Sequence, residues 1–126
     1  MIPKFRAWNK VREEMIDDCD LSITSDGSVL AGDLNYDVES GMLADVTDNV
    51  VIMMSTRLKD KNGTEIYEGD IVKNIYDEIY VVKWFDAGFH LEERYNGGFD
   101  YSELHFGNNK EVIGNIYENP ELLEDN

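Results

Sequence analysis

Turn-forming residues recur at short intervals through the second half of the chain, and this spacing constrains the fold more than any other sequence feature. The turn segments are Asp77-Glu78, Asp86-Ala87-Gly88, Asn96-Gly97-Gly98 and Gly107-Asn108-Asn109. The apolar runs that they separate, each of strand length, cover residues 71–76, 79–85, 89–93, 99–104 and 111–117. Short strands with a turn signal roughly every 8–12 residues are typical of a small barrel or sandwich.

Two further chain reversals precede these strands. Asp60 and Asn62 accept local backbone hydrogen bonds and tolerate a left-handed conformation, and Gly63 completes the first reversal. Gly69 allows the second, a sharp bend into the next strand, where Asp70 is expected to accept hydrogen bonds from backbone amides. Because this bend requires a positive φ, we expect valine at Gly69 to destabilise the fold by more than ~1 kcal/mol.

The chain is predicted to begin with a hairpin. Residues 3–17 contain two apolar-polar alternating segments with Asn9-Lys10 at the turn between them. A short helix over residues 11–19 is the alternative, because Val11, Met15 and Ile16 also fit helical spacing.

Residues 18–50 are the least regular part of the sequence. A turn is expected around Gly27, which takes a positive φ without a Cβ clash, and short strands are expected on both sides of it. Residues 32–37 and 48–49 are predicted to be loop. Residues 50–55 form a continuous apolar run, which predicts a central strand.

A short helical turn is predicted at the end of the sequence. Asn119 is a candidate N-cap, Pro120 suits the first helical position, and Glu121 complements the helix dipole. Leu122 and Leu123 are then expected to dock this turn onto the domain.

The charge of the chain argues against several classes of partner. The net charge is −16, and residues 13–56 lack Lys and Arg while carrying Glu13, Glu14, Asp17, Asp18, Asp20, Asp26, Asp33, Asp37, Glu39, Asp45 and Asp48. Such a field repels phosphate backbones and anionic membranes, so we expect no direct binding to nucleic acid or to a membrane. A basic protein partner fits this charge better.

Targeting signals are not recognisable in the sequence. The first ten residues carry charges where a signal peptide needs an apolar run, and no stretch approaches the ~20 apolar residues of a membrane span. The single cysteine, Cys19, cannot form an internal disulfide, which suits a reducing compartment. We therefore expect a soluble, cytoplasmic protein.

The acidic segments do not predict a metal site. Aligning Gly63 with the glycine of a calcium-binding loop places Leu58 and Gly69 at positions that require oxygen ligands. The segment Asp17-Asp18-Cys19-Asp20 contains ligand-type residues, but we interpret it as a solvated acidic loop.

Catalysis and cofactor binding have no sequence support. His90 and His105 lack zinc-site spacing, Cys19 has no nucleophile signature, and there is no glycine-rich nucleotide-binding motif. The aromatic residues Trp84, Phe85, Phe89, Tyr95, Phe99 and Tyr101 could stack on single-stranded nucleic acid. Only Lys83 and Arg94 lie among them, so we interpret most of these aromatic residues as core.

Three segments together resemble the YopX family. Residues 4–9 (KFRAWN) resemble its KFRAWD-type opening, residues 58–72 (LKDKNGTEIYEGDIV) its central signature, and residues 112–122 (VIGNIYENPEL) its C-terminal one. The resemblance implies a protein encoded by a phage or prophage, with a mostly β structure, an SH3-like barrel in its C-terminal half and no established reaction. Arg57 stands where relatives often carry Gly, so the bend before Leu58 is expected to differ.

Together these features predict a mainly β fold. We expect an N-terminal β-rich subdomain over residues 1–56, with an α+β arrangement as its alternative, and an SH3-like small barrel over residues 57–126 that ends in a short helical turn. No catalytic, cofactor-binding or metal-binding residue is assigned. A structural signature is assigned instead to Trp8, Gly63, Gly69, Asp70, Gly114 and Pro120.

The leading functional hypothesis is a non-enzymatic phage or prophage accessory protein that binds another protein. It rests on fold analogy, because SH3-like barrels often bind partners through loops and exposed aromatic residues. The alternative is an acidic nucleic-acid mimic that occupies a host DNA-binding protein, and the third is an enzyme of unrecognised type. The identity of the partner and the oligomeric state, including a homo-oligomer, stay open at this stage.

Overall fold

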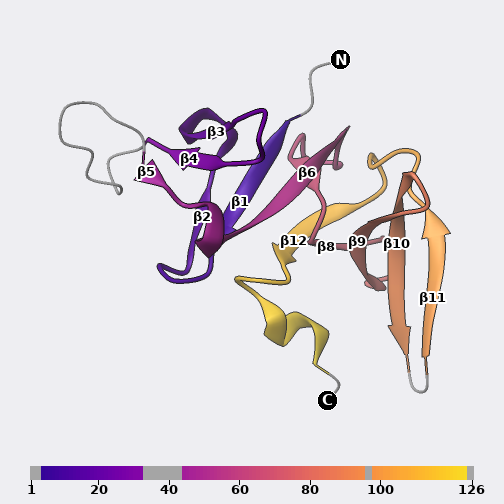
Figure 1. Cartoon of the computed structure of the whole chain (residues 1–126). Helices are drawn as coiled ribbons and strands as arrows, with labels where there is room; N and C mark the ends of the chain where they lie inside the picture. Colours follow the sequence, from indigo (N-terminus) through magenta and orange to yellow (C-terminus); the bar gives the residue numbers. More distant parts are fainter. Residues whose placement is uncertain (1–3, 33–43, 96–97, 125–126) are drawn as a thin grey trace. The chain divides into compact units, whose positions relative to one another are not determined.

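Strands make up most of the regular structure of this protein (Figure 1). The structure is a computed structural model that describes residues 4–32, 44–95 and 98–124. Within these segments the regular elements are twelve strands and three short 3-10 turns, which confirms the mainly β class. No helix in the described segments is long and apolar enough to cross a membrane. The loop predicted at residues 32–37 lies, apart from Gly32, outside the described residues.

The chain divides into two units, Met1–Met54 and Ser55–Asn126. It passes from the first to the second within strand β6 (Val50–Lys59), close to the boundary at residues 56 and 57 that the sequence suggested. The first half of β6 pairs with β1 (Phe5–Asn9), and its second half pairs with β7 (Glu65–Tyr67).

The first unit begins with the predicted hairpin. Strand β1 pairs antiparallel with β2 (Glu14–Ile16), and β6 lies on the other side of β1. The alternative helix over residues 11–19 is wrong. The Asn9 side-chain oxygen accepts hydrogen bonds from the backbone amides of Val11 and Arg12, at 3.0 and 2.9 Å, and so directs the chain into a turn.

A small second sheet completes this unit, in the order β3 (Leu21–Ile23), β4 (Val29–Ala31) and β5 (Ala44–Asp45). The turn between β3 and β4 contains Gly27 with φ of 91°, as predicted. Two segments expected to be loop form 3-10 turns, η1 (Asp18–Asp20) and η3 (Thr47–Asn49), and β5 was not predicted. The core of the unit consists of Ala7, Ile16, Val29, Ala31 and Val46.

The second unit is built on a five-stranded antiparallel sheet with the order β11-β10-β9-β8-β12. Its strands are β8 (Asp70–Lys73), β9 (Ile79–Phe85), β10 (Gly88–Tyr95), β11 (Gly98–Glu103) and β12 (Glu111–Asn115). Figure 1 shows β10 and β11 as a long hairpin with β11 outermost. Closure of this sheet into an SH3-like barrel stays a prediction.

Strand β8 is shorter than the sequence suggested. It ends at Lys73, although apolar residues continue to Tyr76. The Asn74 side-chain oxygen accepts hydrogen bonds from the amides of Tyr76 and Glu78, at 2.9 and 3.0 Å, and so starts a turn that Asp77 continues with φ of 61°. Tyr76 is consequently 76% exposed rather than part of a strand.

The main buried cluster of the second unit lies on one face of this sheet, although Ile71 and Val81 on the other face are also buried. Its buried members are Ile66, Val72, Val82, Leu91 and Leu104, with Leu58, Tyr80, Phe89 and Val112 packed against them. Because side chains alternate between faces along a strand, the residues between these core positions point to the opposite face. That opposite face carries the candidate site described below.

Both predicted turns between β6 and β8 form as the sequence indicated. The Asp60 carboxylate accepts backbone hydrogen bonds from Asn62 and Thr64, both at 2.8 Å, and Gly63 has φ of 84°. In the second turn Gly69 has φ of 87°, and the Asp70 carboxylate accepts a 2.7 Å hydrogen bond from the amide of Tyr67.

The C-terminal turn η4 (Pro120–Leu123) starts with Pro120, as predicted. Asn119 stands at the N-cap position of this turn, as predicted, but its side chain makes no capping hydrogen bond. The Asn119 side-chain oxygen instead accepts a 3.2 Å hydrogen bond from the amide of Asn115, four residues back. Asn119 therefore fixes the end of β12 rather than the start of η4.

Arg57 occupies a conformation that suits glycine better. It lies in β6 with φ of 64°, at the point where the pairing of β6 with β7 shifts register. The Arg57 side chain is exposed, so its removal should cost little packing energy. We expect Arg57→Gly to relieve about 1–2 kcal/mol of backbone strain. Glycine loses more conformational entropy on folding, so the net rise in the free energy of unfolding should be about 0.5–1 kcal/mol. Urea unfolding measures this change. Lys59→Gly, also exposed and in the same strand, is the control and should destabilise; destabilisation by both changes would contradict the assignment of strain to Arg57.

Candidate functional site

Aromatic and charged side chains gather on the face of β9, β10 and β11 opposite to the main buried cluster, beside the buried Val81. Residues directly opposite each other in an antiparallel pair share a face of the sheet. The pairs on this face are Phe85 with Gly88, Lys83 with His90, His90 with Glu103, Glu92 with Tyr101, and Arg94 with Phe99. We call Phe85, His90, Glu92, Arg94, Phe99 and Tyr101 the Glu92 cluster.

Glu92 is the central charge of this cluster and is only 5% exposed. Its carboxylate accepts hydrogen bonds from Nε of Arg94 and from the hydroxyl of Tyr101, both at 2.9 Å. Burial alone would raise the pKa of Glu92, but these two hydrogen bonds and the charges of Lys83 and Arg94 outweigh it and lower the pKa below its ordinary value. Glu92 is therefore ionised at neutral pH and joins β10 to β11.

Ring contacts hold the aromatic members of the cluster in place. Phe85 stacks on the His90 imidazole with 3.9 Å between ring centroids and 14° between ring planes. The edge-to-face contact of Phe85 with Tyr101 spans 5.1 Å, and the Arg94 guanidinium lies 5.7 Å from the centre of the Phe99 ring. Contacts of these kinds are worth about 0.5–1.5 kcal/mol each, so the exposed rings are fixed in orientation.

The interpretation of the aromatic residues as core is wrong for several of them. Tyr101 is 51% exposed, Phe99 is 54% exposed, and Trp84, at the end of β9, is 44% exposed. Phe85 and Phe89 are half-buried. The side chain of Tyr95 lies outside the described part of the chain.

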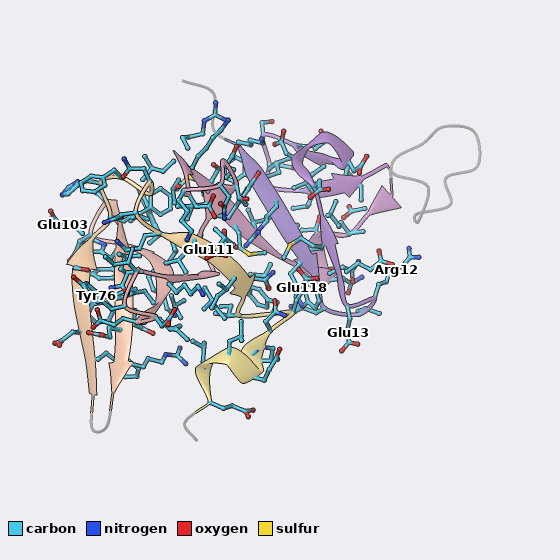
Figure 2. All side chains as sticks on the ribbon, turned by 180° about the vertical axis from the view of Figure 1, so that it is seen from behind. Arg12, Glu13, Tyr76, Glu103, Glu111 and Glu118 are labelled. Carbon is cyan, nitrogen blue, oxygen red and sulfur yellow. The ribbon has the colours of Figure 1, made fainter. Side chains whose placement is uncertain are left out.

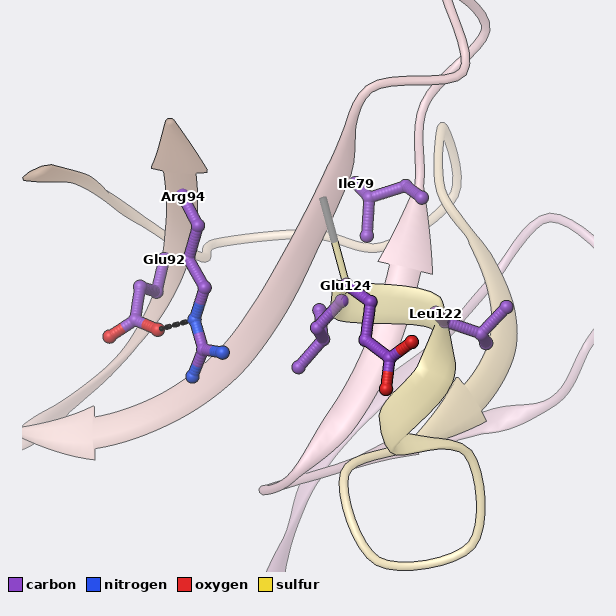
Figure 3. Close-up of a pocket in the computed structure, with 6 residues that line it drawn as sticks. Ile79, Glu92, Arg94, Leu122 and Glu124 are labelled. Atoms are coloured by element: carbon purple, nitrogen blue, oxygen red, sulfur yellow. Dashed lines mark hydrogen bonds and ion pairs between the residues drawn. The ribbon is translucent and has the colours of Figure 1, made fainter. Parts of the chain in front are cut away.

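A hollow of about 190 Å³ adjoins the cluster where η4 lies against this face (Figure 3). Its walls are Ile79, Glu92, Arg94, Leu122, Leu123 and Glu124. Figure 3 shows the ion pair between Glu92 and Arg94 on one side and the residues of η4 on the other. Small-molecule sites usually enclose roughly 300–1,000 Å³, so this hollow is better suited to one side chain of a partner protein.

A second hollow, of about 370 Å³, brings the two histidines together. Its walls are Asp86, Ala87, Gly88, Phe89, His90, Glu103, Leu104 and His105. Nδ1 of His90 lies 3.1 Å from the carbonyl oxygen of Gly88, and Nε2 of His105 lies 2.9 Å from the Glu103 carboxylate. Among the described residues, no group of three or more His, Cys, Asp or Glu is placed to hold a metal ion.

The six residues of the predicted structural signature do not converge on one place. Trp8 lies in β1, and Gly63 and Gly69 lie in the turns before and after β7. Asp70 is buried at the start of β8. Gly114 lies at an irregularity in β12, where a Cβ would come within 2.5 Å of the Asn119 side chain that precedes Pro120. None of the six belongs to the Glu92 cluster.

The sequence contains a signal for the Glu92 cluster that the prediction missed. His90, Glu92 and Arg94 alternate with Leu91 and Glu93 along β10, and this period of two places the first three on one face. Which aromatic residues lie beside them depends on the register between β10 and β11, which alternation within one strand does not fix.

Replacement of Glu92 tests its structural role. We expect Glu92→Gln to lower the free energy of unfolding at pH 7 by about 1–2 kcal/mol, because Arg94 loses its charged acceptor. The pKa of Tyr101, which is raised by its hydrogen bond to Glu92, by burial and by the Glu92 charge, should fall back toward its ordinary value. Urea unfolding and a spectroscopic tyrosine titration measure these two effects.

The pH dependence of this effect follows from the lowered pKa of Glu92. The stabilisation is fully present above the unfolded pKa of about 4.3 and is lost as the pH falls through the folded pKa, so wild type and Glu92→Gln should converge in acid. Glu93→Gln, on the opposite face, is the control and should change stability by less than about 0.5 kcal/mol. Equal effects of the two substitutions would refute the role assigned to Glu92.

Comparison with known proteins identifies the family. The YopX protein family matches residues 4–124. The crystal structure of protein EF1440 from Enterococcus faecalis is 32% identical, with a TM-score of 0.57, and the match covers 98% of this chain and 99% of that one. Protein yopX from Bacillus subtilis is 26% identical, with a TM-score of 0.62, and the match covers 95% and 97% of the two chains. No curated protein matches significantly. The resemblance of the three sequence segments is thereby confirmed, and the chain belongs to the YopX family.

Proposed function

We propose that this chain is a non-enzymatic protein-binding module and that the Glu92 cluster is its contact surface. The observation that carries the proposal is the exposure of Phe99 and Tyr101 above a buried, ion-paired carboxylate. Aromatic residues and Arg are enriched at the centres of protein interfaces and account for most hot spots. Because Glu92 and the ring contacts already fix these side chains, binding costs little additional side-chain entropy.

The absence of a catalytic role is part of this proposal. A general acid or base works best with a pKa near the operating pH, whereas the pKa of Glu92 is lowered and both its oxygens are engaged. We further propose that the module serves a phage or prophage in the cytoplasm of its bacterial host and that it uses no cofactor. The family resemblance supports the phage origin, and the single cysteine is consistent with a reducing compartment.

Affinity capture with matched variants tests the proposal. The full chain, immobilised, is exposed to an extract of Bacillus subtilis, the source of one relative, at ~0.05 M and ~0.5 M salt. Phe99→Ala and Arg94→Ala remove contact groups of the cluster. Tyr76→Ala removes an exposed aromatic residue outside it and serves as the control. We expect a captured protein that survives ~0.5 M salt, where the Debye length is only a few Å, and that is lost with Phe99→Ala and Arg94→Ala but not with Tyr76→Ala. If Phe99→Ala and Arg94→Ala both capture the same protein in the same amount as the unchanged chain, the Glu92 cluster is not the contact surface.

An acidic nucleic-acid mimic is the second candidate function. The observation that favours it is the exposure of Glu13, Asp17, Asp18, Asp26, Asp45 and Asp48 within a segment that lacks Lys and Arg. A mimic would capture a DNA-binding protein with a steep loss of affinity between ~0.05 M and ~0.2 M salt. The same capture experiment therefore separates the two functions by their salt dependence. An enzyme of unrecognised type is the third candidate, and the hollow lined by His90, Glu103 and His105 would be its site.

A further inference from the structure

Strand β11 is an exposed edge that extends the Glu92 cluster. It is the last strand in the sheet order, and among the described residues no strand pairs with its outer side. Residues 99–103 are all exposed. The outer N–H and C=O groups of such a strand are available to a further strand.

This edge carries two acidic side chains, Asp100 and Glu103, but lacks the other usual protections against strand addition. Natural edge strands are commonly blunted by Lys, Pro or a β-bulge. Strand β11 contains neither Lys nor Pro, and its pairing with β10 runs without a register shift from Gly98 to Glu103. A regular edge of six residues is long enough to template an added strand.

The side chains of β11 differ between its two faces. Phe99 and Tyr101 point to the face of the Glu92 cluster, whereas Asp100 and Ser102 point to the other face. Asp100 lies opposite Glu93 of β10, so the face that carries Asp100 and Ser102 is acidic next to the free edge of β11. Glu103, at the end of β11, projects outward from the sheet (Figure 2).

These charges favour a basic occupant over a second copy of this chain. A second copy would bring another net charge of −16 and another Asp100 to the same edge. A strand with Lys or Arg at alternate positions would instead place cations beside Asp100 and apolar residues beside Phe99 and Tyr101. Arg94 does not offset this preference, because its charge is paired with Glu92.

We propose that an extended segment of the partner protein, with Lys or Arg alternating with apolar residues, adds to the sheet along β11. The inference rests on the proposed function and specifies the partner of the same surface. Main-chain hydrogen bonds along the edge provide affinity, and the alternation between Asp100 and the two aromatic residues provides selection.

A synthetic peptide tests this proposal. The probe is a fluorescent eight-residue peptide of alternating Lys and Val, titrated with the full chain at about physiological salt. One control peptide replaces Lys with Glu. A second control keeps Lys but carries N-methyl groups on alternate backbone amides, which removes hydrogen-bond donors without changing the charge. We expect the Lys-Val peptide to bind at least about tenfold more tightly than either control, since each 1.4 kcal/mol lost is a tenfold loss of affinity.

Matched variants of the chain locate the binding edge. Asp100→Lys combined with Glu103→Lys places lysines on β11, and Glu78→Lys combined with Glu121→Lys makes the same change of net charge at exposed residues outside β11. We expect the first variant to lose at least about tenfold in affinity and the second to lose less than about threefold, because only the first variant changes the edge itself. Circular dichroism verifies that both variants fold. If the β11 variant does not fold, the affinities of the Lys-Val peptide and its N-methylated form for the unchanged chain test the proposal.

Three results would overturn the proposal: equal affinity for the N-methylated peptide, equal losses in the two double variants, or self-association of the chain that is abolished by the β11 variant. The outcome is separable from the proposed function. If the peptide fails while captured protein still depends on Phe99 and Arg94, the cluster remains a contact surface and only strand addition is refuted.

Discussion

Asp60→Ala is expected to lower the free energy of unfolding by about 3–5 kcal/mol, enough to unfold a marginally stable domain. The Asp60 carboxylate is 5% exposed and accepts three backbone hydrogen bonds. Two come from Asn62 and Thr64 in the adjacent turn, and the third, at 2.9 Å, comes from Val112, which is 52 residues later in the chain. Alanine would leave all three amides without this acceptor, at about 1–3 kcal/mol for each amide left unsatisfied.

The pH dependence of Asp60 gives an independent check. Burial alone would raise its pKa, but the hydrogen bonds from Val112, Thr64 and Asn62 outweigh burial and lower the pKa. Its stabilisation is therefore present above the unfolded pKa of about 3.9 and is lost as the pH falls through the folded pKa. Unfolding in urea between pH 7 and pH 3 should show wild type and Asp60→Ala converging in acid.

Two variants serve as controls for Asp60→Ala. Asp60→Asn keeps one oxygen for Asn62 and Thr64 but presents an amide nitrogen to Val112, so an intermediate loss is expected. Asp17→Ala removes an exposed carboxylate that makes no capping hydrogen bond to η1. It should change the free energy of unfolding by less than about 0.5 kcal/mol. A loss at Asp60 no larger than that at Asp17 would mean that the three amides find other acceptors.

Gly69→Val should destabilise the protein by about 2–4 kcal/mol, the second large effect expected. Gly69 has φ of 87°, and both of its backbone groups are engaged: its amide donates to the carbonyl oxygen of Val82 at 2.8 Å, and its carbonyl oxygen accepts from the amide of Ile116 at 2.9 Å. These bonds to segments far along the chain prevent the backbone from relaxing to a negative φ. A β-branched side chain adds strain there and also needs space at a buried position.

Substitutions at two other glycines separate these contributions. Gly63 has a similar φ of 84° but open space around a Cβ, so Gly63→Val should cost only the conformational strain, about 1–2 kcal/mol. A Cβ at Gly88 would make only ordinary contacts, the nearest at 3.7 Å, so Gly88→Ala should be close to neutral. Thermal unfolding of the three variants tests whether destabilisation decreases from Gly69→Val to Gly63→Val to Gly88→Ala. An unchanged melting temperature for Gly69→Val would refute the need for glycine in this turn.

The turns were predictable from the sequence because their chemistry is local. Asp60 and Asp70 accept turn hydrogen bonds from amides at most four positions away, and Gly63 and Gly69 supply the positive φ that these turns need, so the structure has the turns as predicted. The same locality explains why the strands after Gly69 were delimited nearly correctly. Their turn residues act on the adjacent backbone whatever the rest of the chain does.

Other local predictions failed because a side chain had two available partners. Asn119 is a residue type that often caps helices. Its side-chain oxygen nevertheless accepts a hydrogen bond from the amide of Asn115, before it in the chain, and none from the amides of η4 after it. Asn74 stops β8 although the following residues are apolar. Propensity alone does not decide between such competing hydrogen bonds.

The candidate site was the least predictable part, because it depends on pairing between strands. Tyr101 reaches Glu92 only because β10 and β11 pair in one register, and a shift by one residue would place Tyr101 on the core face. The third hydrogen bond of Asp60, to Val112, is equally invisible in a linear sequence. Charge and composition indicated a basic protein partner, but the surface that would meet it required the structure.

Hydrogen–deuterium exchange with a captured partner tests the central claim most directly. Amide exchange of the full chain, alone and in the complex, reports which backbone segments the partner protects. If the Glu92 cluster is the contact surface, protection should rise over β9, β10 and β11, with the largest change in β11. Protection confined to the acidic segments 13–32 and 44–49, with β11 unchanged, would contradict the account and favour a nucleic-acid mimic.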